Sequence, residues 1–327
     1  MLVVVAPGQG AQSPGFLTPW LALPGFAARL AALSHALQAR PDAAAGALGL
    51  AHYGTEADAD TIRDTAVAQP LLVAAGVAAL AELVGSDDPA GAGAYDVVAG
   101  HSVGELTAAY AAGVLTGEQA MTLVGARGDA MAAAAATTRT GMTAVLGGDR
   151  DEVLAAVAAA GLTPANDNGS GQLVVGGTLD QLAAFAAAPP ARTRLVPLQV
   201  AGAFHTEHMR PAVDALAAVA AGLEPADPRV PLLSNRDGEQ VGSGREALDR
   251  IVAQVANPVR WDLCTEALQK LGVTALIELP PAGTLAGLAK RGLKGIEILA
   301  LKTPDDLDAA RALVREHGTG GDTEGRR

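Results

Sequence analysis

One serine of this 327-residue chain stands where a hydroxyl can become a nucleophile. Ser102 is the centre of Gly100-His101-Ser102-Val103-Gly104, which fits the nucleophile-elbow pattern G-x-S-x-G. The apolar run at 95–99 predicts a strand that enters this turn, and residues 105–112 predict a helix that leaves it. A serine on such a turn is raised clear of the backbone, and the two glycines permit the crowded conformation. The alternative interpretation is a serine that caps a helix.

A serine hydroxyl needs a base, and the chain has six histidines, at positions 35, 52, 101, 205, 208 and 317. His101 adjoins the serine, and neighbouring side chains on a sharp turn point apart, so a structural or oxyanion-side role is favoured for it. His205 follows the strand predicted at 193–200 and is our preferred base, with His208 as its competitor. The single cysteine, Cys264, is interpreted as a small buried apolar residue rather than a nucleophile.

The elements that must position these residues predict an α/β fold in two parts. A strand at 1–6, a glycine-rich loop at 7–12, alanine-rich helices, the elbow unit and a helix at 117–136 indicate an α/β-hydrolase-like large domain with a mostly parallel sheet. Residues 137–200 predict the order β-α-β-β-α-β, with a turn at 167–171, which is the ferredoxin-like arrangement.

We therefore expect a large catalytic domain at 1–136 and 201–316, with a small ferredoxin-like subdomain inserted at 137–200. The glycine-rich, polar residues 317–327 predict a disordered tail.

Composition narrows the class of protein. The net charge of −12 argues against nucleic-acid binding, which needs a basic surface. The uncharged stretch 1–28 contains four prolines and cannot form a spanning helix, and the apolar run 2–6 is too short for a signal peptide. One cysteine allows no internal disulfide. We expect a soluble, cytoplasmic, monomeric protein that has no zinc-ligand spacing and makes no membrane contact.

The motifs resemble those of the malonyl-CoA:acyl carrier protein transacylases, discrete enzymes of type II fatty acid or polyketide biosynthesis. The alanine-rich, lysine-poor composition is similar to that of actinobacterial members. The matching segments follow the order of the family along nearly the whole chain: 7–12, Gln69-Pro70, 100–105, Arg127-Gly128, 166–168, 202–205, Ser234-Asn235 and 254–261.

This resemblance implies a serine–histidine dyad. Ser102 would carry the acyl group as an ester, and His205 would be the base. The resemblance further implies that the backbone carbonyl of Gln254 orients the imidazole, in place of an acidic residue. The backbone N–H groups of Gln9 and Val103 would form the oxyanion hole.

The resemblance also assigns residues to the substrate. Arg127 would pair with the free carboxylate of the malonyl group, a bidentate contact that an acetyl group cannot make. Without the family context, a helix arginine in a surface ion pair is the favoured interpretation of Arg127. Val103 and Phe204 resemble the malonyl-selective pattern, and Phe204 would fill the space that a 2-methyl branch needs.

Four further polar residues are expected in or near the cleft. Asn166 and Asn168 are expected to line it and touch the substrate, although the run Asn-Asp-Asn-Gly suggests plain turn residues equally well. His101 flanks the site, and Gln69 is expected to support the glycine-rich loop.

The implied reaction moves a malonyl group from malonyl-CoA to the phosphopantetheine thiol of acyl carrier protein, with no metal or other cofactor. An acidic carrier must meet a local cationic patch on this acidic chain. Lys290, Arg291 and Lys294 form the densest basic cluster, which is either that patch or a solvated helix end. The alternatives are a trans-acting polyketide acyltransferase of the same chemistry, a serine esterase or thioesterase, and a catalytically silent carrier-binding module.

Overall fold

The computed structural model describes residues 1–40 and 49–318 of the chain. Its larger part is built on a four-stranded sheet with the order β2-β1-β8-β9, and all neighbouring strands are parallel. These strands are β1 (Leu2–Ala6), β2 (Val97–Gly100), β8 (Ala275–Glu278) and β9 (Glu297–Ala300).

Both faces of this sheet are covered by helices, because alternate side chains of each strand point to opposite sides. On β1, Leu2 and Val4 join one apolar core, while Val3 and Val5 join another. The first core includes residues of α1 (Pro24–Gln38), α2 (Leu50–Thr55), α3 (Thr65–Val84), α4 (Gly104–Ala111), α5 (Gly117–Thr137), α8 (Arg210–Ala221), α9 (Gly244–Gln254) and α12 (Leu307–His317). The second includes residues of α10 (Trp261–Leu271) and α11 (Thr284–Gly292).

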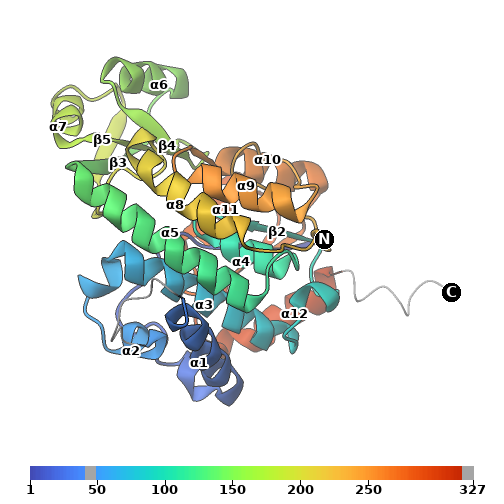
Figure 1. Cartoon of the computed structure of the whole chain (residues 1–327). Coiled ribbons are helices and arrows are strands. Elements are labelled where there is room, and N and C mark those ends of the chain that lie inside the picture. The colour runs from blue at the N-terminus through green and yellow to red at the C-terminus, as the bar shows by residue number, and fades with distance from the viewer. Residues whose placement is uncertain (41–48, 319–327) are drawn as a thin grey trace.

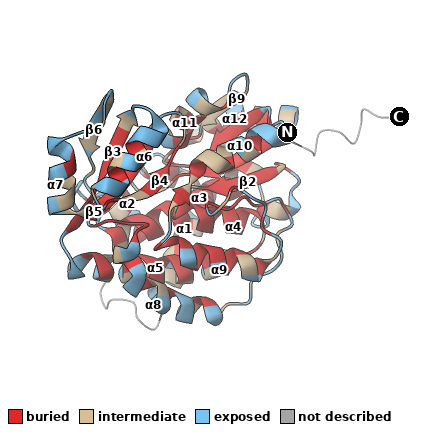
Figure 2. Ribbon diagram, turned by 90° about the horizontal axis from the view of Figure 1, so that it is seen from above, coloured by how far each residue is buried: buried red, intermediate tan, exposed pale blue. Residues whose placement is uncertain are grey.

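Short 3₁₀ helices join several of these elements: η1 (Trp20–Ala22), η2 (Thr61–Arg63), η3 (Pro89–Gly91), η4 (Glu207–Met209) and η5 (Pro304–Asp306). Among the described residues, one stretch, Thr65–Gly91, is long and apolar enough to cross a membrane, and 83% of its window is buried. It contains α3, which is a core helix of this fold (Figure 2).

A second sheet lies at one end of the molecule (Figure 1). Its order is β6-β3-β5-β4-β7, with antiparallel neighbours from β6 to β4. The strands are β3 (Thr140–Gly147), β4 (Thr163–Asp167), β5 (Gln172–Thr178), β6 (Thr193–Pro197) and β7 (Val259–Arg260), and the helices are α6 (Arg150–Ala159) and α7 (Leu179–Ala187).

The predicted fold class is confirmed: a parallel sheet with helices on both faces is joined to a βαββαβ sheet. One feature differs from the expectation. The second sheet has a fifth strand, β7, which pairs in parallel with β4 at Asn166 and Asp167. A two-residue strand has no periodicity of its own, so the sequence gives no sign of it. The boundaries of the two domains stay predictions.

The predicted tail lies almost wholly outside the described residues. His317, which was included in it, is instead the last residue of α12.

Glu278 connects the parallel sheet to the start of α11. This side chain ends β8, is fully buried, and accepts backbone hydrogen bonds from Gly283 (2.7 Å), Leu285 (2.9 Å) and Ala286 (2.8 Å). The N–H groups at a helix N-terminus have no partner within the helix, so this carboxylate supplies acceptors that would otherwise be missing.

The replacement Glu278→Gln exchanges one of the two acceptor oxygens for a donor. At least one buried N–H then loses its partner, and we expect the free energy of unfolding to fall by about 1–3 kcal/mol. Urea denaturation followed by circular dichroism measures this loss. The same substitution at the exposed Glu239 is the control, and equal unfolding midpoints for the two variants would contradict the assignment.

Candidate active site

The nucleophile elbow forms where β2 turns into α4. Ser102 has φ 54°, a conformation that L-residues adopt rarely and that is typical of strained functional turns. A Cβ on Gly104 would collide with the Ala6 carbonyl oxygen, and one on Gly100 would collide with the Gly104 backbone. Both flanking positions therefore require glycine. The side chain of Asn235 also holds the turn, since its Oδ1 accepts from the Ser102 backbone N–H at 2.8 Å.

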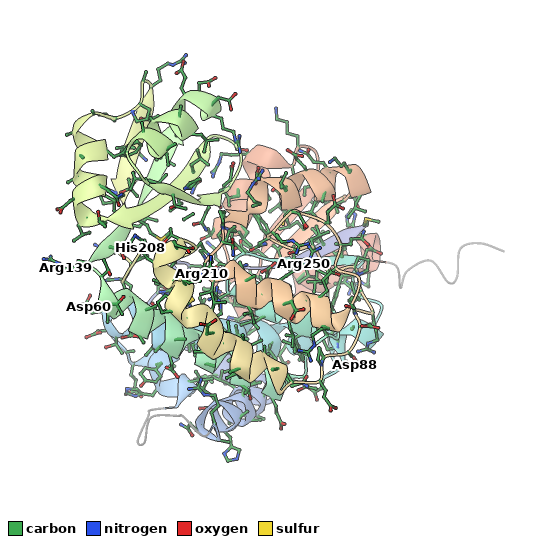
Figure 3. All side chains as sticks on the ribbon, turned by 45° about the horizontal axis from the view of Figure 1, so that its top comes forward. Asp60, Asp88, Arg139, His208, Arg210 and Arg250 are labelled. Carbon is green, nitrogen blue, oxygen red and sulfur yellow. The ribbon has the colours of Figure 1, made fainter. Side chains whose placement is uncertain are left out.

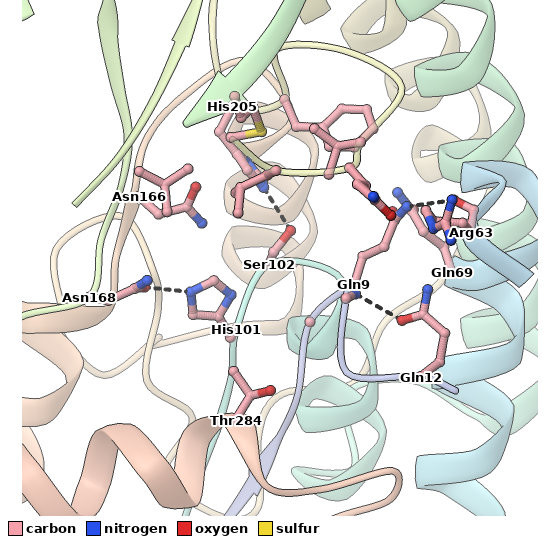
Figure 4. A pocket seen from close by; sticks show the side chains of 18 of the residues that line it. Gln9, Gln12, Arg63, Gln69, His101, Ser102, Asn166, Asn168, His205 and Thr284 are labelled. Atoms are coloured by element: carbon pink, nitrogen blue, oxygen red, sulfur yellow. Dashed lines mark hydrogen bonds between the residues drawn. The ribbon is translucent and has the colours of Figure 1, made fainter. Parts of the chain in front are cut away.

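Ser102 and His205 form a hydrogen-bonded pair (Figure 4). The distance from Ser102 Oγ to His205 Nε2 is 2.7 Å, and His205 Nδ1 lies 2.9 Å from the backbone oxygen of Gln254. A carbonyl can only accept, so Nδ1 carries the proton and Nε2 offers its lone pair to the hydroxyl.

Burial, together with the positive charge of Arg127, lowers the pKa of His205 to about 3, and the hydrogen bond to the Gln254 carbonyl opposes this shift. The imidazole is therefore neutral near pH 7, which is the form that can accept the serine proton.

The guanidinium of Arg127 also lies within hydrogen-bonding distance of the Ser102 hydroxyl. Arg127 lies on α5, is 1% exposed, and its Nη2 is 3.3 Å from Ser102 Oγ. Nη2 also donates to Gln254 Oε1 at 3.1 Å, and Nη1 donates to Gln69 Oε1 at 2.7 Å. The expected role of Gln69 was therefore wrong: it holds the arginine and not the glycine-rich loop. The alternative of a surface ion pair for Arg127 is also wrong.

The guanidinium stays charged in this setting. Burial lowers the pKa of Arg127 to about 10, and the nearby Glu105 carboxylate opposes the shift. Among the described residues, Arg127 Nε is a buried donor without a hydrogen-bond partner. A buried, charged donor of this kind is suited to a ligand that brings its own acceptor.

Glu105 belongs to this cluster, and the sequence analysis gave it no role. The carboxylate is buried in the first turn of α4, accepts from the Asn235 backbone N–H at 2.6 Å and accepts from Gln254 Nε2. Burial raises the pKa of Glu105 to about 7, and the Asn235 N–H and Arg127 oppose this shift. The signal available in the sequence was the position of a glutamate directly after the elbow glycine.

A cleft of about 500 Å³ opens above the dyad. Both parts of the molecule line it, and the predicted residues that face it are Gln9, His101, Ser102, Asn166, Asn168, Phe204 and His205. Arg127 and Gln254 are not among the residues that line the cleft, but both lie within hydrogen-bonding distance of the dyad.

The predicted oxyanion donors lie at the same place. Gly8 packs so closely against His101 that a Cβ would stand 2.9 Å from its carbonyl oxygen, which brings the glycine-rich loop against the elbow. Within residues 1–40 and 49–318, neither the Gln9 nor the Val103 backbone N–H donates to another protein atom. Their role at an oxyanion stays a prediction.

The remaining candidates fall into two groups. His101 and Asn168 bond each other across the cleft, with Nε2 and Oδ1 2.9 Å apart, and the His101 ring lies 5.6 Å from that of Trp261 (Figure 4). His208 is on η4, next to the start of α8, and makes no pair with the serine (Figure 3). Preferring His205 over His208 agrees with this geometry.

The predicted basic cluster lies close to the cleft. Lys290, Arg291 and Lys294 are exposed at and just beyond the C-terminal end of α11. The opposite end of this helix lines the cleft through Thr284, and Arg291 Nη2 donates to Gln172 Oε1, itself a lining residue, at 3.0 Å.

Two other groups take no part in the site. Cys264 is buried, and burial raises the pKa of its thiol, so it behaves as the expected small core residue. Among the described residues, one group, Glu297, Glu316 and His317, brings its ligand atoms close enough for a metal ion, and none of the three lines the cleft.

Comparison with known proteins identifies the family. The model of the acyl transferase domain family matches residues 3–314. The malonyl CoA-acyl carrier protein transacylase of Mycobacterium tuberculosis strain H37Rv is 51% identical over 308 residues, which cover 94% of this chain and 98% of the relative.

Two solved structures are similar throughout. The crystal structure of MCAT from Mycobacterium tuberculosis has a TM-score of 0.88 and 50% identity, and covers 95% of this chain and 99% of its own. A type II PKS acyl-carrier protein in complex with its malonyl-transacylase has a TM-score of 0.84 and 30% identity, with 95% and 99% coverage.

The site and fold define a serine acyltransferase. The chain belongs to the acyl transferase domain family, and the resemblance to the malonyl-CoA:acyl carrier protein transacylases is confirmed.

The shifted pKa of His205 leads to a test. In protein labelled with ¹³C-histidine, we expect the His205 resonances to keep their neutral positions from about pH 8 to about pH 5. In Arg127→Met the positive charge that lowers the pKa is gone, so the midpoint should move upward. Nuclear magnetic resonance titration measures both. A wild-type midpoint near the ordinary value of about 6.5 would refute this electrostatic account, and Arg315→Met, a change at an exposed residue, is the control.

Proposed function

We propose that this protein moves a malonyl group from malonyl-CoA to the phosphopantetheine thiol of an acyl carrier protein through an ester on Ser102. The observation that carries this proposal is a buried, protonated guanidinium 3.3 Å from a serine hydroxyl that is already bonded to a neutral imidazole. The dyad can attack an activated acyl carbonyl such as that of a thioester, and the arginine favours an acyl group that carries a free carboxylate.

The first half-reaction forms the ester. His205 Nε2 takes the proton of Ser102 Oγ, the oxygen attacks the thioester carbonyl, and the oxyanion develops near the backbone N–H groups of Gln9 and Val103. When the tetrahedral intermediate collapses, the C–S bond breaks and His205 returns its proton to the leaving sulfur. In the second half, the carrier thiol gives its proton to His205 and its sulfur attacks the ester carbonyl. The C–O bond to Ser102 then breaks, and His205 returns the proton to Ser102 Oγ.

Each proton thus leaves and returns through one imidazole, and the reaction written in this way needs no metal or redox group. A thioester and a serine ester are close in energy, so transfer runs in both directions. The carbonyl of Gln254 keeps the proton on Nδ1 throughout.

Selectivity for malonyl follows from the buried charge. The carboxylate of a malonyl ester lies a few bonds from Ser102 Oγ, which is the reach of Arg127. An acetyl group leaves the guanidinium with its unpartnered Nε, and an unpaired buried charge is costly. Phe204, buried at the cleft wall, supports the further expectation that a 2-methyl branch is disfavoured.

The carrier is proposed to dock on the exposed basic cluster Lys290, Arg291 and Lys294. The cluster is close to the cleft mouth, and a solved relative is a malonyl-transacylase bound to its carrier protein. A cytoplasmic location suits a chain whose one cysteine is buried and reduced. The monomeric state stays a prediction.

Intact-mass spectrometry tests the reaction itself. Mixed with malonyl-CoA, the wild-type protein should gain a malonyl adduct on Ser102, and Ser102→Ala should gain none. Arg127→Ala should lose at least about 100-fold in malonylation rate, because a charge-assisted bidentate contact disappears, and its relative use of acetyl-CoA should rise. Unimpaired malonylation of Arg127→Ala would leave a general esterase or thioesterase as the better assignment.

Charge reversal tests the docking face. The double variant Lys290→Glu, Arg291→Glu should raise the KM for acyl carrier protein by about 10-fold, since opposite charges at an interface rim steer association. Its acylation by malonyl-CoA should stay as in wild type. Arg315→Glu, a reversal at an exposed residue of α12, is the matched control. Equal KM values for the double variant and wild type would exclude this face.

A further inference from the structure

A buried polar relay adjoins the reacting groups, and the mechanism above gives no role to two of its three side chains. The relay consists of Glu105 on α4, Gln254 at the end of α9 and Arg127 on α5, all of them buried. The side-chain amide of Gln254 stands between the other two. Its Nε2 donates to Glu105 Oε2, and its Oε1 accepts from Arg127 Nη2 at 3.1 Å.

The direction of this amide is set by Arg127 and Glu105 together. A guanidinium only donates hydrogen bonds, so the oxygen end of Gln254 has to face Arg127, and the NH₂ end then faces Glu105, which accepts from it in its ionised form. Glu105 is itself fixed, because its other oxygen accepts from the Asn235 backbone N–H at 2.6 Å. Asn235 Oδ1 accepts a second bond from Gln254 Nε2 at 3.0 Å, which holds the amide from another side.

The acceptors that hold the guanidinium are both neutral. Gln69 Oε1 receives Nη1 and Gln254 Oε1 receives Nη2, while the carboxylate of Glu105 acts on Arg127 from one side chain farther away. A carboxylate bonded directly to Arg127 would have to be displaced by the carboxylate of an incoming substrate. Amide acceptors position the charge and leave it without a counterion in contact.

We propose that Glu105 and the side chain of Gln254 are positioning residues for acyl selectivity, which hold Arg127 through an amide spacer and keep its charge available to a carboxylate-bearing acyl group. This inference rests on the proposed malonyl transfer. It gives Gln254 two separate roles, since its backbone oxygen orients His205 and its side chain orients Arg127.

The variant Gln254→Met separates those roles. Methionine has a similar length, keeps the backbone carbonyl that His205 needs, and removes the amide. The measurement is the rate of Ser102 acylation, by intact mass, with malonyl-CoA and with acetyl-CoA in parallel. We expect the malonyl-to-acetyl rate ratio to fall by about 10-fold, because one hydrogen bond to a charged group is lost. Gln269→Met, the same change at an exposed glutamine, should leave the ratio at its wild-type value.

A pair of exchanges tests the spacer itself. In Glu105→Gln the side chain at 105 has one acceptor oxygen in place of two and no longer fixes the NH₂ end of Gln254. The malonyl-to-acetyl rate ratio should therefore fall as in Gln254→Met. The double variant Glu105→Gln, Gln254→Glu restores a donor–acceptor pair between the two positions but sets a carboxylate directly on Arg127. Its ratio should therefore stay low.

The outcomes are distinct. A wild-type protein that takes no malonyl adduct refutes the proposed function, whatever the variants do. If wild type is malonylated and Gln254→Met loses both rates equally, the relay is only structural and this inference fails. If the double variant keeps the wild-type ratio, a carboxylate bonded directly to Arg127 serves as well as the amide, and the proposed need for a neutral spacer is refuted. Should Glu105→Gln not fold, the Gln254→Met ratio alone decides.

Discussion

The site depends on one physical constraint: the buried guanidinium beside the serine hydroxyl has to remain charged without a carboxylate in direct contact. Taking a charge out of water is costly, and Arg127 is 1% exposed. Its pKa nevertheless falls only to about 10, because Glu105 lies one amide away. The surrounding side chains act as neutral acceptors. Together they stabilise the buried cation in the free protein but leave its Nε without a hydrogen-bond partner.

This constraint also explains why a backbone carbonyl orients the base. A carboxylate at the position of the Gln254 oxygen would put a counterion close to Arg127, where the proposed function places the carboxylate of the substrate. The carbonyl fixes the tautomer of His205 and adds no charge. Because Arg127 is one cause of the low pKa of His205, the proposed pairing of Arg127 with a substrate carboxylate would raise that pKa and strengthen the base when the matching acyl group binds.

Local patterns in the sequence were enough to predict the elbow, the dyad's serine and the βαββαβ order, since turn chemistry and strand alternation are properties of short segments. His205 was preferred as the base for its place after the strand predicted at 193–200, and the family resemblance agreed, whereas the roles of Arg127 and of the Gln254 carbonyl came from the resemblance alone. Three features were beyond reach. The amide of Gln254 contacts Arg127 and Glu105 across 127 and 149 residues, and its direction depends on both. Gln69 was given the wrong partner for the same reason. Strand β7 exists only through its pairing with β4.

The short segment from Gln254 to Arg260 joins the catalytic residues to the second sheet. It begins at the residue whose backbone holds His205 and whose side chain holds Arg127. It ends at β7, which extends the second sheet beside Asn166 and Asp167. Across the cleft, Asn168, which directly follows β4 of the same sheet, bonds His101, the neighbour of the nucleophile. The second sheet is therefore tied to the dyad from both sides, so a shift of that sheet would move the imidazole and the elbow together. Such a double attachment preserves the 2.7 Å distance between Ser102 Oγ and His205 Nε2 at a cleft that both parts of the molecule line.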